Sequence, residues 1–269
     1  MRNIICAKGQ VNVNAGDNSF SRGTPLSQTE AATELIINRL AVIDGLQNGR
    51  ISREDCIVTL PERKFLYENI FDNVVSWSGQ KGMDIVSEGH WNKLPYKPFY
   101  QNYGRDKDLI HDVPYNMDIV NSDLEDFLIC IPRLKRSDTR RNLELSYWKT
   151  FIDDMSNHIS KIIIFGKDTQ HLANGNNIIY VDTLQDYCSY LHHKKCKHVV
   201  STISGPCHYV QQFGNVNGNC TLSMIDNASM IPPTGHEDPS YFHPCINFTN
   251  VNINWIKEVP EPNKLKEYI

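Results

Sequence analysis

Short apolar runs alternate with segments of helical spacing through the second half of the chain, and this alternation limits the fold more than any other feature. The clearest run is Lys161–Phe165, one lysine followed by four apolar residues, which stops at Gly166. Parallel strands covered by helices on both faces are typically continuous apolar runs of this kind. The segments Leu143–Met155 and Thr183–Leu191 have the apolar spacing of amphipathic helices. The pattern predicts parallel βαβ units, and therefore a doubly wound α/β sheet. Its expected strands are Phe127–Ile131, Lys161–Phe165, Asn177–Val181 and His198–Thr202.

The first half has the same alternation with shorter runs. A helix is expected over Leu26–Leu46, and the Gly- and Pro-rich region Gly79–Tyr115 is expected to be irregular surface. The expected strands are Asn3–Ala7, Asp55–Leu60 and Asn73–Trp77. The sequence therefore predicts two α/β domains, residues 1–122 and 123–255, with residues 256–269 as a C-terminal tail or a helix that packs back.

Composition excludes several classes of protein. The net charge of -4 and a pI near 6.2 give no overall attraction to nucleic acid or to an anionic membrane, so anion binding must come from local basic patches. No apolar stretch approaches the roughly 20 residues of a membrane span, so we expect no integral membrane segment. The eight cysteines form no Cys-x-x-Cys pair. That scatter is typical of buried free thiols and predicts a reducing, cytoplasmic location.

The loop Thr202–His208 follows the last of these strands and is the first candidate for an anion site. Gly205 permits close backbone approach, and Pro206 suits the first turn of a helix. Free N–H groups and the helix dipole favour an anion there, and the hydroxyls of Thr202 and Ser204 add donors. The alternative is a plain helix N-cap, Ser204, with no ligand. The candidate binding residues are Thr202, Ser204, Gly205, Pro206 and His208.

The loops after the other strands hold further candidates, because ligands of open α/β sheets bind beyond the carboxyl ends of the strands. Residues 133–141 contain five basic side chains and one acid, and arginine binds phosphate oxygens bidentately. The alternative is a solvated charge run. Asp182 follows another strand, where it would contact a ribose or base, or else Asp182 or Thr183 caps the next helix. The candidates in these loops are Arg133, Arg136, Arg140, Gly166, Lys167 and Asp182.

The long N-terminal loop supplies the candidate catalytic carboxylates. Asp17 is the best placed to act as a general base on a hydroxyl, although Gly-Asp-Asn also forms turns. Glu30, near the start of the following helix, is the second candidate. The chain has no Walker loop and no Gly-x-Gly-x-x-Gly. We expect arginines and backbone amides, and no metal or bound cofactor, to neutralise phosphate charge.

In this order the motifs resemble those of heptosyltransferase-like glycosyltransferases of the GT-B architecture. Val199–His208 resembles the strand, Ser-Gly-Pro-x-His turn and helix of that group. Phe127–Arg133, with the following Arg140-Arg141-Asn142 and Tyr147-Trp148, is similar to the arginine-bearing first strand and helix of the nucleotide-sugar-binding half. Ile162–Gly166 is similar to its second strand, and Gly16-Asp17 to the N-terminal Gly-Asp whose Asp serves as base.

The resemblance implies two Rossmann-like domains that face each other across a cleft, with a nucleoside-diphosphate sugar bound mainly to the C-terminal one. It implies that Asp17 or Glu30 deprotonates a hydroxyl of a carbohydrate acceptor. Arg133, Arg136 or Arg140 would then stabilise the leaving diphosphate together with the amides of Ser204 and Gly205. Such a transfer is inverting and metal-independent. The alternatives are a nucleotide-sugar epimerase of the same architecture and a non-catalytic nucleotide- or glycan-binding protein.

Overall fold

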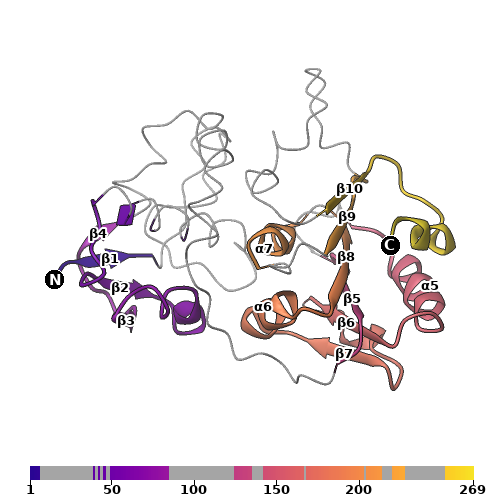
Figure 1. The fold of residues 1–269 in the computed structure, drawn as a ribbon, viewed down its shortest axis with the longest axis horizontal. Coiled ribbons are helices and arrows are strands. Elements are labelled where there is room, and N and C mark those ends of the chain that lie inside the picture. The colour runs from indigo at the N-terminus through magenta and orange to yellow at the C-terminus, as the bar shows by residue number, and fades with distance from the viewer. Residues whose placement is uncertain are drawn as a thin grey trace. The chain divides into compact units, whose positions relative to one another are not determined.

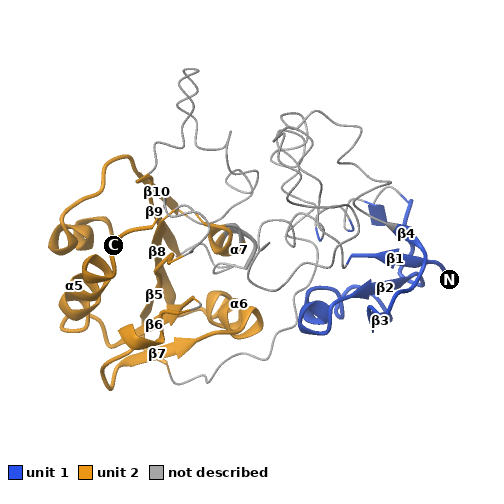
Figure 2. Ribbon diagram, turned by 180° about the vertical axis from the view of Figure 1, so that it is seen from behind, with its two compact units in different colours: residues 1–117 blue, residues 118–269 orange. Residues whose placement is uncertain are grey.

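The structure is a computed structural model of the 269-residue chain. It describes residues 1–6, 39, 42, 45–46, 49–84, 124–134, 142–166, 168–202, 204–213, 220–227 and 252–269. The chain forms two compact units, Met1–Met117 (unit 1) and Asp118–Ile269 (unit 2), which are coloured separately in Figure 2. No helix among the described residues is long and apolar enough to cross a membrane.

Unit 2 contains a six-stranded sheet in which every strand pairs in parallel with its neighbours. The strand order is β10-β9-β8-β5-β6-β7, so a second set of strands is added on the other side of the first strand, β5. This is the 3-2-1-4-5-6 order of dinucleotide-binding folds. The strands are β5 (Phe127–Ile131), β6 (Lys161–Phe165), β7 (Ile178–Val181), β8 (Cys196–Thr202), β9 (Thr221–Ile225) and β10 (Asn252–Ile256).

Helices cover both faces of this sheet (Figure 1). Helix α5 (Leu145–Met155) and the 3-10 helix η4 (Pro262–Tyr268) lie on one face, and α6 (Leu184–His192) and α7 (Pro206–Phe213) lie on the other. A short 3-10 helix, η2 (Gln170–Leu172), joins β6 to β7. The final residues, expected as a tail or helix, thus form η4, where Lys266 pairs with Asp154 of α5 at 3.1 Å.

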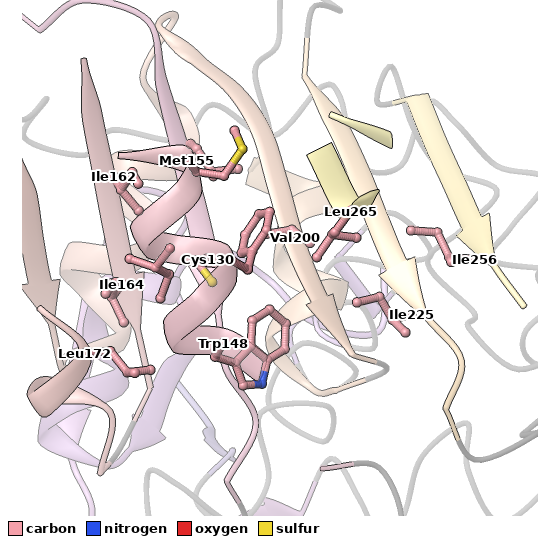
Figure 3. Close-up of a cluster of buried hydrophobic side chains, with 13 residues drawn as sticks. Cys130, Trp148, Met155, Ile162, Ile164, Leu172, Val200, Ile225, Ile256 and Leu265 are labelled. Carbon is pink, nitrogen blue, oxygen red and sulfur yellow. The ribbon is translucent and has the colours of Figure 1, made fainter. Parts of the chain in front are cut away.

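The main core lies between the sheet and α5 (Figure 3). Trp148, Phe151, Ile152 and Met155 follow the i, i+3, i+4, i+7 spacing of one helical face, and all four are buried. They pack on strand residues that include Cys130, Ile164 and Val200, each with 0% of its surface exposed. Burial of each such side chain stabilises the unit by about 1.5–3 kcal/mol.

Unit 1 has a smaller parallel sheet in the order β3-β2-β1-β4. The strands are β1 (Asn3–Ile5), β2 (Cys56–Thr59), β3 (Asn73–Ser76) and β4 (Met83–Asp84), and the 3-10 helix η1 (Pro61–Leu66) follows β2. Strand β4 falls in the region expected to be irregular. The helix expected over 26–46 lies mostly outside the described residues, although residues 39, 42, 45 and 46 are helical.

An ion pair fixes the start of this smaller sheet. Arg2 Nη2 lies 2.8 Å from Asp55 Oδ2, and the backbone N–H groups of Arg2 and Ser52 also donate to the Asp55 carboxylate, at 3.0 and 2.9 Å. The Arg2 guanidinium holds the pKa of Asp55 well below its usual range. The sheets of both units are parallel, so the prediction of an α/β chain with parallel sheets is confirmed.

Candidate functional site

The carboxyl ends of β5 and β8 mark the place where the strand order of unit 2 reverses. The two strands are neighbours, with Ile131 opposite Ser201 in register. The chain leaves β5 towards α5 and leaves β8 towards α7, and these helices cover opposite faces of the sheet (Figure 1). Connections that diverge in this way leave a crevice between the strand ends, which is where open α/β sheets bind their ligands.

Serine hydroxyls hold the two strand ends together. Ser201 Oγ lies within donating distance of two backbone oxygens, that of Ile131 at 3.1 Å and that of Thr202 at 2.7 Å, and it lies 3.2 Å from Ser204 Oγ. Ser204 Oγ in turn lies 3.5 Å from Cys207 Sγ. Both serines are buried, so these contacts satisfy hydroxyls that have little access to water. The turn from β8 into α7 is therefore anchored to β5.

The N-terminus of α7 is placed at this edge by a tyrosine of the neighbouring helix. Tyr187 of α6 donates its hydroxyl to the backbone oxygen of Pro206 at 3.0 Å. Burial raises the pKa of Tyr187 well above its usual value, so the hydroxyl keeps its proton. Gly205 and Pro206 are half-buried at the start of the helix. Pro206 has no N–H and the Cys207 N–H donates to the Ser204 oxygen at 3.1 Å, so an anion at this turn would be favoured by the positive end of the helix dipole and by the amides that precede Pro206.

Arg133 follows β5 at the same edge and is only 8% exposed. Its Nη1 donates to Asn142 Oδ1 at 2.7 Å. The backbone oxygen of Asn142 accepts a bond from Asn227 Nδ2 at 3.2 Å, just beyond β9. Asn142 therefore connects the loop after β5 with the end of β9. An asparagine before a helix is usually a capping residue, so the sequence alone gives no signal that Asn142 orients an arginine.

Thr202 is the last residue of β8 and has 0% of its surface exposed. Its Oγ1 has no hydrogen-bond partner among the described residues. A buried hydroxyl without a partner costs roughly 1–3 kcal/mol, and such groups in native proteins usually have a functional or solvent explanation.

The loop after β6 closes against the loop after β5. Gly166 has φ 151°, and a Cβ at this position would lie 3.2 Å from the backbone oxygen of Pro132. The Gly166 oxygen accepts bonds from Thr169 Oγ1 at 2.7 Å and from Tyr180 Oη at 3.2 Å. This close approach requires glycine, and it fixes the chain next to Arg133.

One described candidate, Asp182, is not part of this cluster. Asp182 is exposed at the end of β7, the edge strand, which β6 separates from β5. Thr183 rather than Asp182 caps α6, because the N–H of Asp186 donates to Thr183 Oγ1 at 3.1 Å. The side chain of His208 and the candidates of three loops lie outside the described residues: Asp17, Glu30, Arg136, Arg140 and Lys167.

Comparisons with known proteins place the fold. No family model matches the chain, and no curated protein matches it. The structure of Escherichia coli ADP-heptose LPS heptosyltransferase II matches with a TM-score of 0.53 and 8% identity, over 100% of this chain and 97% of that chain. A glycosyltransferase of family 9 from Veillonella parvula DSM 2008 matches with a TM-score of 0.55 and 10% identity, over 99% and 95%. E. coli heptosyltransferase WaaC with ADP matches with a TM-score of 0.50 and 10% identity, over 100% and 98%. The chain therefore has the fold of these glycosyltransferases, as the sequence motifs predicted.

Proposed function

We propose that this protein is a glycosyltransferase that moves a sugar from a nucleoside-diphosphate donor to a hydroxyl of a glycan acceptor. The observation that carries the proposal is that Arg133, Thr202 and the N-terminus of α7 all follow the carboxyl ends of the neighbouring strands β5 and β8, where the order of the sheet reverses. One of the solved structures with this fold is a heptosyltransferase with ADP.

The chemistry of this edge suits a diphosphate. Arg133 offers guanidinium donors held in position by Asn142, and the turn before α7 offers the amides of Ser204 and Gly205 with a favourable helix dipole. Donors that are already oriented stabilise the negative charge that develops on a leaving group, because they need little reorganisation during the reaction. Arg136, Arg140 and Lys167 would add charge from the adjoining loops, and Asp182 would contact the donor only at its outer edge.

The acceptor side of the proposal rests on unit 1. In the proposed reaction Asp17, or Glu30 in its place, takes the proton of an acceptor hydroxyl, and that oxygen attacks the anomeric carbon of the donor sugar. The oxygen attacks on the face opposite the diphosphate, and the bond from this carbon to the diphosphate breaks as the new bond forms, so the configuration inverts. The two units would act as Rossmann-like domains facing a common cleft, with the donor on unit 2, in a protein of the cytoplasm.

Nucleotide binding is the first experiment. Thermal unfolding is measured with UDP, GDP, ADP and CMP, since a ligand at 100 times its Kd stabilises a protein by about 2.7 kcal/mol. Arg133→Gln should weaken binding of the stabilising nucleotide at least tenfold, because a charge-assisted bond to phosphate is lost. Arg53→Gln, an exposed arginine of unit 1, is the matched control and should bind normally. If none of the four nucleotides stabilises the protein, the proposal is wrong.

Transfer is then separated from mere binding. Asp17→Ala should abolish sugar transfer while nucleotide binding persists, whereas a non-catalytic binding protein shows no turnover in either form. An epimerase would convert the donor sugar without an acceptor, which chromatography of the nucleotide sugar detects.

Metal independence is tested by chelation. Asp106 and Asp108 have the Asp-x-Asp spacing that can hold a metal ion against a diphosphate, and they lie outside the described residues. Turnover should be unchanged in EDTA. A loss that Mg²⁺ or Mn²⁺ restores would show that the transfer uses a metal.

A further inference from the structure

A cavity of about 800 Å³ lies at the amino ends of the unit 2 strands, at the opposite edge of the sheet from the candidate functional site. Its walls come from the start of β5, the end of α5 with the following turn, the start of β8 and the C-terminal residues. Ile159 and Ile269, both half-buried, give it an apolar wall, whereas Phe127 and Met155 beneath them are only 1% and 4% exposed. Its volume lies in the range of cavities that bind small molecules.

Carboxylates already hold two of the three lysines that line this cavity. Lys195 Nζ lies 3.1 Å from Asp126 Oδ1, and Lys266 Nζ lies 3.1 Å from Asp154 Oδ2. Glu125 adds an exposed carboxylate to the lining. The cavity is therefore not strongly cationic, and this distinguishes it from a site for a diphosphate or polyphosphate.

Lys197 and His198 are the polar groups left for a ligand. Lys197 has no ion pair among the described residues, and it is half-buried on β8. The neighbouring His198 also lines the cavity, and its Nδ1 is buried without a hydrogen-bond partner in the described part of the chain. Burial and the Lys197 ammonium lower the pKa of His198, so its ring is neutral and adds a polar contact without a second charge.

We propose that this cavity binds a small monoanionic amphiphile, a carboxylate whose head lies at Lys197 and His198 and whose apolar body packs on Ile159 and Ile269. One lysine without a carboxylate partner matches one negative charge. The apolar wall favours a hydrocarbon or aromatic body over a sugar, because it offers few partners for hydroxyl groups. This site does not depend on the proposed glycosyl transfer.

Calorimetry with octanoate as the probe tests the proposal on the full chain. The intact protein should bind octanoate saturably, and octanamide, which has the same body without the charge, should bind about tenfold more weakly. Lys197→Gln should weaken octanoate binding by a similar factor. Lys264→Gln should leave it unchanged, since Lys264 is exposed on η4 outside the cavity. Absence of octanoate binding, or equal binding of octanamide, would overturn the proposal.

A second variant tests the place of binding without changing a charge. Ser160 is exposed and lines the cavity, so Ser160→Phe should fill part of it and abolish octanoate binding while the unfolding temperature changes little. Unchanged affinity in both Lys197→Gln and Ser160→Phe would show that octanoate binds elsewhere and that the cavity is not its site.

Discussion

Gly166→Ala tests whether the close contact between the loops after β5 and β6 supports the proposed nucleotide site. The added Cβ would lie 3.2 Å from the backbone oxygen of Pro132 and 3.3 Å from Thr169 Cγ2, so at least one of the two must move. Gly166 also has φ 151°, where a side chain strains the backbone by roughly 1–3 kcal/mol. Because a domain of about 150 residues loses roughly 2–4 °C per kcal/mol, we expect unfolding roughly 2–12 °C lower.

The same displacement should reach Arg133, which follows Pro132 directly. We expect Gly166→Ala to weaken nucleotide binding as well as stability, as measured by calorimetry on the folded variant. Gly175→Ala is the matched control: its φ is not positive, and its Cβ would meet Ile178 Cδ1, the end of a flexible side chain, at 3.3 Å. Equal unfolding temperatures for the two variants would refute the contact. Normal nucleotide affinity in a destabilised Gly166→Ala protein would refute its link to Arg133.

Three further substitutions test other parts of the argument. Thr202→Val removes a buried hydroxyl that has no described hydrogen-bond partner, so the variant without nucleotide should be at least as stable as the unmodified protein, while its affinity for nucleotide falls. A lower unfolding temperature of the variant would show that the hydroxyl makes a hydrogen bond. Asp55→Asn should lower the unfolding temperature at pH 7. Arg2 lowers the folded-state pKa of Asp55, so the ionised Asp55 stabilises the fold above the unfolded-state pKa of about 3.9, and this stabilisation is lost as the pH falls further. Below pH 4 the unfolding temperature of Asp55→Asn should therefore depend less on pH than that of the unmodified protein, as scanning calorimetry measures. Ser223→Ala removes a 2.6 Å hydrogen bond to the Tyr268 backbone oxygen, so it should lower stability by about 1 kcal/mol and speed proteolysis near the C-terminus. Unchanged cleavage would mean that the Asn254 side chain, 2.9 Å from the same oxygen, is sufficient to hold the C-terminal residues in place.

The central strands could be predicted from the sequence because they are buried on both faces. The apolar runs of β5 and β6 have no polar interruption after Lys161, and helical spacing between the runs predicted α5 and α6. Strands β9 and β10, which were not among the expected strands, lack this signal. β10 reads Asn-Ile-Asn-Trp-Ile, and asparagine disfavours strands. β9 contains Ser223, which is buried because it bonds to Tyr268, 45 positions along the chain, and no local pattern reveals such a partner.

Some features of the candidate site could likewise be predicted from the sequence, and others could not. Strand-end positions such as Thr202 and Arg133 follow from the rule that ligands bind beyond the carboxyl ends of parallel strands. The contacts that hold these side chains in position do not follow from that rule. Arg133 meets Asn142 only because the chain returns to this edge to begin α5, and Tyr180 reaches Gly166 only because β7 lies beside β6. In the sequence, Asp182 follows a strand as the other candidates do, but the strand order shows that this strand, β7, is the outermost strand of the sheet.

The same geometry distinguishes the two interpretations of Ser204. A plain helix cap requires its hydroxyl to accept a bond from an amide of the first turn. In the structure the N–H of Cys207 donates instead to the backbone oxygen of Ser204, at 3.1 Å, and the hydroxyl faces Ser201 and Cys207 Sγ. The Ser204 hydroxyl therefore ties the end of β8 to the first turn of α7. For this reason Arg133 and Thr202 are the side chains whose substitution should affect the nucleotide most directly.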